Sequence, residues 1–250
     1  MTDIDPGPDK SNDGQGDVQR VLYGRRVGRP LRLYRQALVD NFLPAVEVIN
    51  PNPGEPATPR SQFSTPYDAY WLEIGFGAGE HLAWQARANP NVGIIGCEPY
   101  LNGVARLLAE MDESNLTNIR IFRDDARFLL AGLPDARISR IFVLFPDPWP
   151  KSRHHKRRVV GPSVIADLAR ILCDGAELRI ATDDPGYKGW ILQHVLAKGD
   201  FDWFARRPSD WRNRPDDWPP TRYEQKAKSA GRRGAFFRFA RRSRVVLKNG

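Results

Sequence analysis

Apolar and amphipathic segments alternate along most of this 250-residue chain. Apolar segments rich in β-branched residues lie at 69–74, 92–97, 118–123, 139–145 and 176–181. Segments with helical periodicity lie at 79–88, 102–113, 125–131, 162–173 and 186–198. Because parallel strands are joined by crossover helices, this alternation predicts an α/β fold with a doubly wound sheet and helices on both faces. Two further strand candidates follow, at 201–205 and 235–240.

The first apolar segment runs directly into a glycine-rich turn, Glu73-Ile74-Gly75-Phe76-Gly77-Ala78-Gly79. Glycines at alternate positions let the backbone turn sharply and approach a ligand at a helix N-terminus. A dinucleotide-binding turn would have its third glycine where this chain has Glu80, which argues against a nicotinamide-dependent oxidoreductase. Glu73 would repel a pyrophosphate but attract a cation, and S-adenosylmethionine carries both a sulfonium and an amino group.

Acidic residues also follow the next two strand candidates. Glu98 comes about 20 residues after the glycines, where a carboxylate can accept hydrogen bonds from both ribose hydroxyls. The third strand candidate ends at Asp124-Asp125, and one of this pair could hydrogen-bond an adenine. Since ligands of open α/β sheets bind at the carboxyl ends of the strands, these acids are expected to meet in one pocket.

The fourth strand candidate ends in Pro146-Asp147-Pro148-Trp149-Pro150. The prolines that flank Asp147 fix the backbone around it, because each locks its own φ and restricts the residue before it. A rigid carboxylate beside an aromatic ring suits a flat, amine-bearing substrate such as a nucleobase. Directly after it, five of the eight residues at 151–158 are Lys or Arg.

The charge of the chain is unevenly distributed. The net charge is +8, but residues 1–17 contain five Asp and one Lys, a net of −4, so the remainder carries 8 + 4 = +12. A domain with this charge is expected to meet a polyanion, either nucleic acid or an anionic membrane surface. The segments 20–35 and 226–248 are rich in Lys and Arg and contain no Asp or Glu. Together with 151–158, they are candidates for contacts with phosphates.

Composition also predicts how the chain is organised. Residues 1–19 are predicted to be a disordered leader, 20–66 a basic extension with a Pro-rich connection, and 67–250 the α/β domain. Within that domain, the Trp-, Pro- and Arg-rich segment 206–234 is long for a plain connection and is predicted to bind substrate. Cys97 and Cys173 form no metal motif and are expected to be reduced core thiols, as in a cytoplasmic protein. No apolar run approaches the length needed to span a bilayer, and because the N-terminus is acidic and polar, unlike a secretory signal, no export is expected.

Two side-chain roles in the segment 206–234 and beside it can be predicted. Thr221 is a candidate helix N-cap that would pair with the acid Glu224, three residues later. Trp211 and Trp218 are candidates to stack on nucleobases, whereas Trp203 is expected in the core.

These motifs together resemble the bacterial tRNA (guanine-N7)-methyltransferase family, over roughly residues 20–241. The resemblance is carried by five segments: Leu72–Gly77, Phe145–Trp149, Lys151–Arg158, Ala181–Asp183 and Thr221–Gln225. It implies a Rossmann-like class I methyltransferase fold, with a mostly parallel seven-stranded sheet and an antiparallel C-terminal strand. It also implies transfer of a methyl group from S-adenosylmethionine to N7 of a guanine in the variable loop of tRNA, with no metal and no obligate protein partner.

The resemblance assigns roles to individual residues. Cofactor contacts are implied for Glu73, Gly75, Gly77, Glu98, Asp125 and Asp147. Substrate contacts are implied for Lys151, Asp183, Thr221, Arg222, Tyr223 and Glu224. Asp125 is preferred over Asp124 because it directly precedes Ala126.

Asp147 is the candidate catalytic residue. Guanine N7 has an exposed lone pair and no proton to lose, so methylation needs alignment more than a general base. We therefore expect Asp147 to stabilise the positive charge that develops on the ring. Two alternatives stay open: a methyltransferase acting on a different base atom, and a non-catalytic RNA-binding protein on a methyltransferase scaffold.

Overall fold

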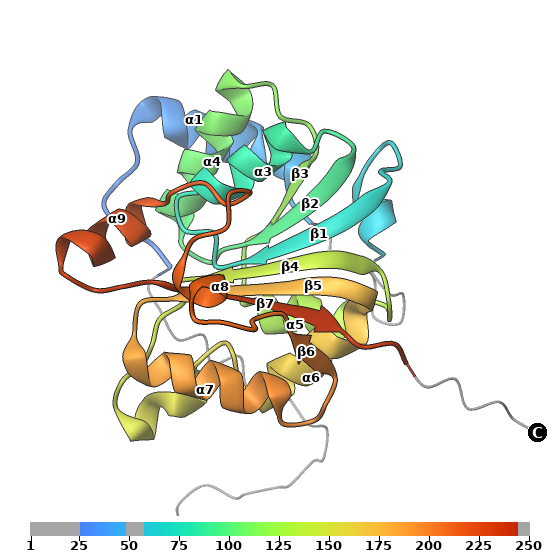
Figure 1. Ribbon diagram of the computed structural model, residues 1–250. Coiled ribbons are helices and arrows are strands. Elements are labelled where there is room, and N and C mark those ends of the chain that lie inside the picture. The colour runs from blue at the N-terminus through green and yellow to red at the C-terminus, as the bar shows by residue number, and fades with distance from the viewer. Residues whose placement is uncertain (1–25, 49–57, 245–250) are drawn as a thin grey trace, which may run out of the picture.

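The structure is a computed structural model that describes residues 26–48 and 58–244 (Figure 1). The predicted leader, 1–19, lies outside the described residues. Within the described ranges, no helix is both long enough and apolar enough to cross a bilayer.

One seven-stranded sheet runs through the molecule in the order β3-β2-β1-β4-β5-β7-β6. Strands β1 to β5 are parallel to one another, and β7 is antiparallel to both β5 and β6. This arrangement confirms the predicted fold class. The strands are β1 (Ala69–Ile74), β2 (Val92–Cys97), β3 (Ile119–Phe122), β4 (Ile138–Leu144), β5 (Leu172–Thr182), β6 (Phe201–Trp203) and β7 (Ala235–Arg241).

Helices cover both faces of the sheet and enclose two hydrophobic cores (Figure 1). On one face lie α1 (Leu33–Asn41), α2 (Leu43–Val46), α3 (Glu80–Ala88) and α4 (Leu101–Glu113). On the other lie α5 (Ala126–Gly132), α6 (Pro162–Ile171) and α7 (Pro185–Leu196). Short helices complete the described chain: η1 (Pro59–Gln62), η2 (Ser152–Arg157), α8 (Ser209–Arg212) and α9 (Arg222–Ser229).

The sequence did not predict α1 and α2, because α1 buries no residue completely and α2 is a single turn of four residues. The predicted boundary between helix 162–173 and strand 176–181 was also wrong. Helix α6 ends at Ile171 and β5 begins at Leu172, which already pairs with Ile138. The register then shifts before Glu177 pairs with Arg140, since the intervening residues turn through Gly175 at a φ of 78°. Both cysteines are free thiols: Cys97 is buried, as expected, and Cys173 is only partly buried.

Helix α7 anchors the basic loop that contains η2. The buried backbone of Val160, at the end of this loop, is bonded to two side chains of the helix. Its N–H donates to the Tyr187 hydroxyl at 3.1 Å, and its carbonyl accepts from the Trp190 indole N–H at 2.6 Å. Arg158 also lies over both rings, so the basic run of the loop is held beside the end of β4.

Replacing Tyr187 with Phe should lower the free energy of unfolding by about 1–3 kcal/mol, because the buried Val160 N–H would lose its acceptor. Urea denaturation measures the change. The matched control is Tyr34→Phe, since Tyr34 is 49% exposed and its hydroxyl bonds to the exposed Asp112. The control should change stability by less than about 0.5 kcal/mol. Equal effects of the two changes would contradict the anchoring role of Tyr187.

Candidate functional site

A cavity of about 990 Å³ opens at the carboxyl ends of β1, β2, β3 and β4. It lies where the strand order reverses on either side of β1, the usual place for a ligand in an open α/β sheet. Nine of the sequence-predicted site residues line it: Glu73, Gly75, Gly77, Glu98, Asp125, Asp147, Thr221, Arg222 and Tyr223.

The glycine turn forms the floor of this cavity. Gly75, Gly77 and Gly79 have φ values of 73°, 59° and 81°, which residues with a side chain rarely adopt. No atom lies within 4 Å of where a Cβ of Gly75 would stand, so the space beside this backbone is open. Helix α4 packs tightly against the turn from behind, since a Cβ on Gly103 would lie 2.1 Å from the Gly77 carbonyl oxygen.

Glu73, at the end of β1, is only 2% exposed. Its Oε2 atom lies 2.7 Å from Nδ1 of His81, which is also buried. A carboxylate in such surroundings needs a hydrogen-bonding partner. His81 supplies that partner on one oxygen.

Glu98, at the end of β2, is held by the backbone. One carboxylate oxygen accepts from the N–H of Gly77 at 2.8 Å, and the other accepts from the N–H of Tyr100 at 3.0 Å. Burial raises the pKa of Glu98, while these two hydrogen bonds act in the opposite direction. Since each oxygen has a second lone pair, the carboxylate can still accept hydroxyl groups of a ligand.

Both acids after β3 lie in the cavity, and both have partners. Asp125 caps α5 by accepting from the N–H of Arg127 at 3.0 Å, and it is paired with the Arg127 guanidinium. Asp124 accepts from Arg26 of the N-terminal extension at 3.1 Å. The extension is thus tied to the edge of the cavity.

Asp147 sits in a strained segment. Phe145 and Trp149, on either side of it, have φ values of 50° and 41°, a region that non-glycine residues rarely occupy. The Phe145 N–H donates to Ala181 on β5, and Arg158 donates to the Pro148 carbonyl at 2.7 Å. Among the described residues none hydrogen-bonds the Asp147 carboxylate, so its oxygens remain available to a ligand.

Helix α9 closes the cavity on the side opposite the sheet. Thr221 caps it by accepting from the N–H of Glu224 at 3.2 Å, which confirms the predicted capping. Arg222 is bound to Glu80 of α3 through its backbone N–H at 3.1 Å and through its guanidinium at 2.5 Å. Tyr223 stands over the glycine turn, with its ring 3.6 Å from the position of a Cβ on Gly77.

Three predicted substrate residues do not line the cavity. Lys151 is exposed at the start of η2, Asp183 is paired with Arg232 at 2.8 Å, and Glu224 is paired with Arg214 at 3.2 Å. The stacking role predicted for Trp218 is wrong, because the side chain is buried at 2% exposure. Trp211 stacks on Phe237 of β7 and is partly buried against the core. Trp203 is also partly buried against the core.

Several residues of the site carried no individual sequence signal. Gly103 lies inside an ordinary helical pattern. Glu80 was noted only because it occupies the position of the third glycine of a dinucleotide-binding turn, and nothing indicated its contact with Arg222. Exposed or half-exposed cations surround the cavity, from segments as far apart as the N-terminal extension and α9. These cations are Arg29, Arg35, Arg106, Arg157, Arg222 and Lys226.

Comparison with known proteins gives consistent matches. A family model described as "putative methyltransferase" matches residues 68–236. A tRNA (guanine-N(7)-)-methyltransferase of Rhodospirillum rubrum is 52% identical over 227 residues, which are 90% of this chain and 89% of that protein. One of Nitrobacter hamburgensis is 41% identical over 239 residues, 96% and 92% of the two chains. The solved 16S rRNA methyltransferase KamB shares the fold, with a TM-score of 0.54 at 17% identity over 74% of this chain and 91% of that one.

The contact between α4 and the glycine turn predicts that Gly103→Ala destabilises the protein by about 1–3 kcal/mol, because the added methyl group displaces the Gly77 carbonyl. The control is Gly189→Ala on α7, where a Cβ would meet no atom within 4 Å. This change should stabilise by about 0.5–1 kcal/mol through helix propensity. Thermal unfolding of the two variants is the measurement, and similar shifts in both would disprove the close contact.

Proposed function

Because this chain belongs to the bacterial tRNA (guanine-N7)-methyltransferase family, we propose that it transfers a methyl group from S-adenosylmethionine to N7 of a guanine in tRNA. The observation that carries the proposal is the separation of charge at the cavity. Glu73 and Glu98 are nearly buried on its inner wall, whereas Arg29, Arg106 and Arg222 are exposed around it. Such a site suits a small cation inside and a polyanion outside.

The inner wall fits S-adenosylmethionine by its chemistry. The buried Glu73 carboxylate matches an ammonium group, and the lone pairs left on Glu98 match two ribose hydroxyls. The open backbone at Gly75 leaves room for the chain that joins these groups. Asp125 would take the adenine edge, in competition with Arg127. When bound, this cofactor supplies a methyl group on a sulfonium centre, which a lone pair can attack.

Asp147 is proposed to act on the guanine. Its carboxylate can accept hydrogen bonds from the N–H edge of the base, which orients N7 without removing a proton. Methylation leaves the ring positively charged, and a carboxylate nearby stabilises this charge as it develops. The strained, proline-flanked backbone would hold the group in place, so little reorganisation is needed during the reaction.

The outer surface is proposed to bind the tRNA. In an RNA helix the N7 edge lies in a deep, narrow groove that side chains cannot enter, so the guanine must be accessible in a loop or drawn out of its stack. Tyr223 is placed to contact such a base: it is 61% exposed above the glycine turn. Its pKa is raised by partial burial and by the nearby carboxylates of Glu98 and Asp147. The surrounding cations would bind phosphates.

The direct test is incubation of the protein with labelled S-adenosylmethionine and unmodified tRNA, followed by nucleoside mass spectrometry. The expected product is N7-methylguanosine. Label on adenosine or on another guanine atom would show a methyltransferase of different specificity. Binding of tRNA with no transfer of label would show a non-catalytic RNA-binding protein.

Asp147→Asn should lower kcat on the order of 10²- to 10³-fold, because the charge that stabilises the product ring is lost. The affinity for tRNA should fall only modestly, since phosphate contacts supply most of it. Single-turnover methylation and filter binding measure the two effects. The control is Asp135→Asn, an exposed carboxylate that pairs with Arg170 away from the cavity. Equal losses of turnover and tRNA affinity would mean that Asp147 only binds.

A further inference from the structure

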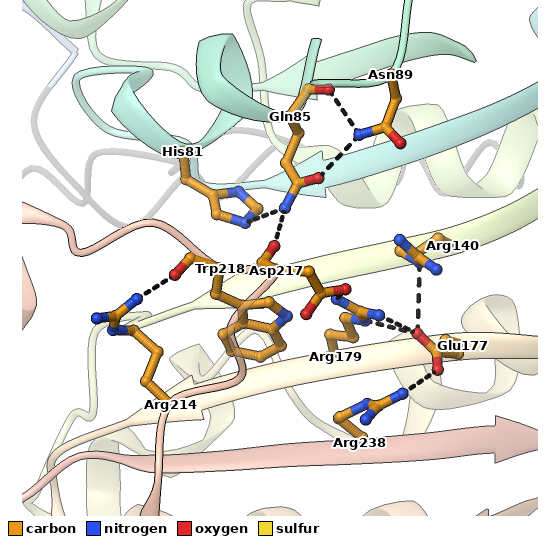
Figure 2. A network of polar contacts seen from close by, with 10 residues as sticks. All are labelled: His81, Gln85, Asn89, Arg140, Glu177, Arg179, Arg214, Asp217, Trp218 and Arg238. Carbon is orange, nitrogen blue, oxygen red and sulfur yellow. Dashed lines mark hydrogen bonds and ion pairs between the residues drawn. The ribbon is translucent and has the colours of Figure 1, made fainter. Parts of the chain in front are cut away.

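Residues 213–218, which we call the strap, connect α8 to the segment before α9 and lie across the sheet (Figure 2). The indole of Trp218 is buried among three rings, with centroid distances of 5.6 Å to Phe236, 6.3 Å to Phe142 and 6.4 Å to His81. The Asp217 carboxylate is 2.7 Å from the guanidinium of Arg179, a β5 side chain that is 2% exposed. The strap is therefore fixed to the sheet by both packing and charge.

A chain of hydrogen bonds leads from the strap to the proposed cofactor site. The Gln85 amide donates to the Asp217 carbonyl at 2.8 Å, and the same nitrogen lies 3.2 Å from Nε2 of His81. Nδ1 of His81 in turn lies 2.7 Å from Glu73. Gln85, His81 and Glu73 are each at most 3% exposed, so water has little access to the contacts among these three, whereas the bond to Asp217 is part-buried.

The partners of Gln85 determine which way its amide points. The Asp217 carbonyl can only accept, so the Gln85 atom facing it must be the NH₂ nitrogen. On the other side, the Asn89 amide lies 3.3 Å from Oε1 of Gln85 and donates to it. With this orientation, the same nitrogen has a second hydrogen to donate to His81, and Figure 2 shows the contact between the two side chains.

The orientation of Gln85 decides the tautomer of His81. Because Gln85 donates to Nε2, that nitrogen must carry the lone pair, and the proton must be on Nδ1. Nδ1–H then donates to one oxygen of Glu73. A neutral donor leaves the full negative charge on the carboxylate and leaves its other oxygen free, whereas the opposite tautomer would set a lone pair against it.

We propose that His81 is a positioning residue for Glu73, and that the strap, through Gln85, selects the His81 tautomer on which this positioning depends. The proposal rests on the proposed function, in which Glu73 binds the ammonium group of the methyl donor. It also gives the strap a role: the segment that leads into α9 fixes the orientation of an acid on the opposite wall of the cavity.

Two substitutions of His81 separate positioning from packing. His81→Leu keeps most of the volume but has no donor, and His81→Asn can place an amide N–H near the position of Nδ1. We expect the Leu variant to raise the Kd for S-adenosylmethionine about tenfold or more, the scale of a hydrogen bond to a charged group, with a smaller change in kcat. The Asn variant should recover most of the affinity. Calorimetry and steady-state kinetics are the measurements.

His194→Leu is the matched control, because His194 stacks on Trp190 of the same helix α7, outside the cavity, and its loss should leave the Kd unchanged. An Asn variant as weak as the Leu variant, or a Leu variant as tight as the unmodified protein, would overturn the proposal. If the unmodified protein binds no S-adenosylmethionine and methylates no tRNA, the proposed function fails instead.

Nitrogen-15 NMR of the imidazole rings tests the tautomer directly in the unmodified protein, so it does not depend on whether His81→Leu folds. The unmodified protein should show His81 protonated at Nδ1 alone. Gln85→Leu removes the donor to Nε2 and should shift His81 toward the other tautomer, with a parallel rise in the Kd for S-adenosylmethionine. A proton on Nε2 in the unmodified protein would contradict the proposal, whatever the variants do.

Discussion

The site depends on two carboxylates that are buried inside the protein and receive hydrogen bonds from it. Removing a carboxylate from water is costly unless its oxygens receive hydrogen bonds, and Glu73 and Glu98 are both nearly buried. The donors are supplied by the fold: backbone N–H groups for Glu98 and the His81 ring for Glu73. A ligand with its own donors and a positive charge would satisfy the lone pairs that remain on both carboxylates, which is the reason for proposing S-adenosylmethionine here.

These donors are in place because of the sheet topology. The chain reverses direction across the sheet after β3, so that β1 has β2 on one side and β4 on the other. The loops after these strands then diverge to opposite faces and leave a cavity between them. The strand order places Glu98, after β2, on one side of the glycine turn. It places the strained Asp147 segment, after β4, on the other side. Helix α4 supports the turn from behind, at a position where even a methyl group would not fit.

The sequence predicted the parts of this site that depend on local pattern. The alternation of elements, the glycine turn and the acids at the strand ends all follow from short-range rules, and the structure brings these acids to one cavity. It did not predict the strap, because the bond between Gln85 and Asp217 joins residues 132 positions apart, neither of which stands out in its own segment. It misjudged Trp218 for a related reason: a Trp in a polar, Pro-rich segment gives no sign that three distant rings will enclose it.

The strap shows how the chain fills the part of the sheet that no long helix covers. Helices α3 and α4 cover the β1 side of this face, and charged residues of β4, β5 and β7 occupy the rest: Arg140, Glu177, Arg179 and Arg238 (Figure 2). A buried Arg179 between Glu177 and Asp217 would be destabilising if either acid were lost. Since Asp217 comes from the segment that leads to α9, the sheet is complete only when this segment is docked. Burial of this part of the sheet and the position of α9 over the cavity therefore depend on the same segment.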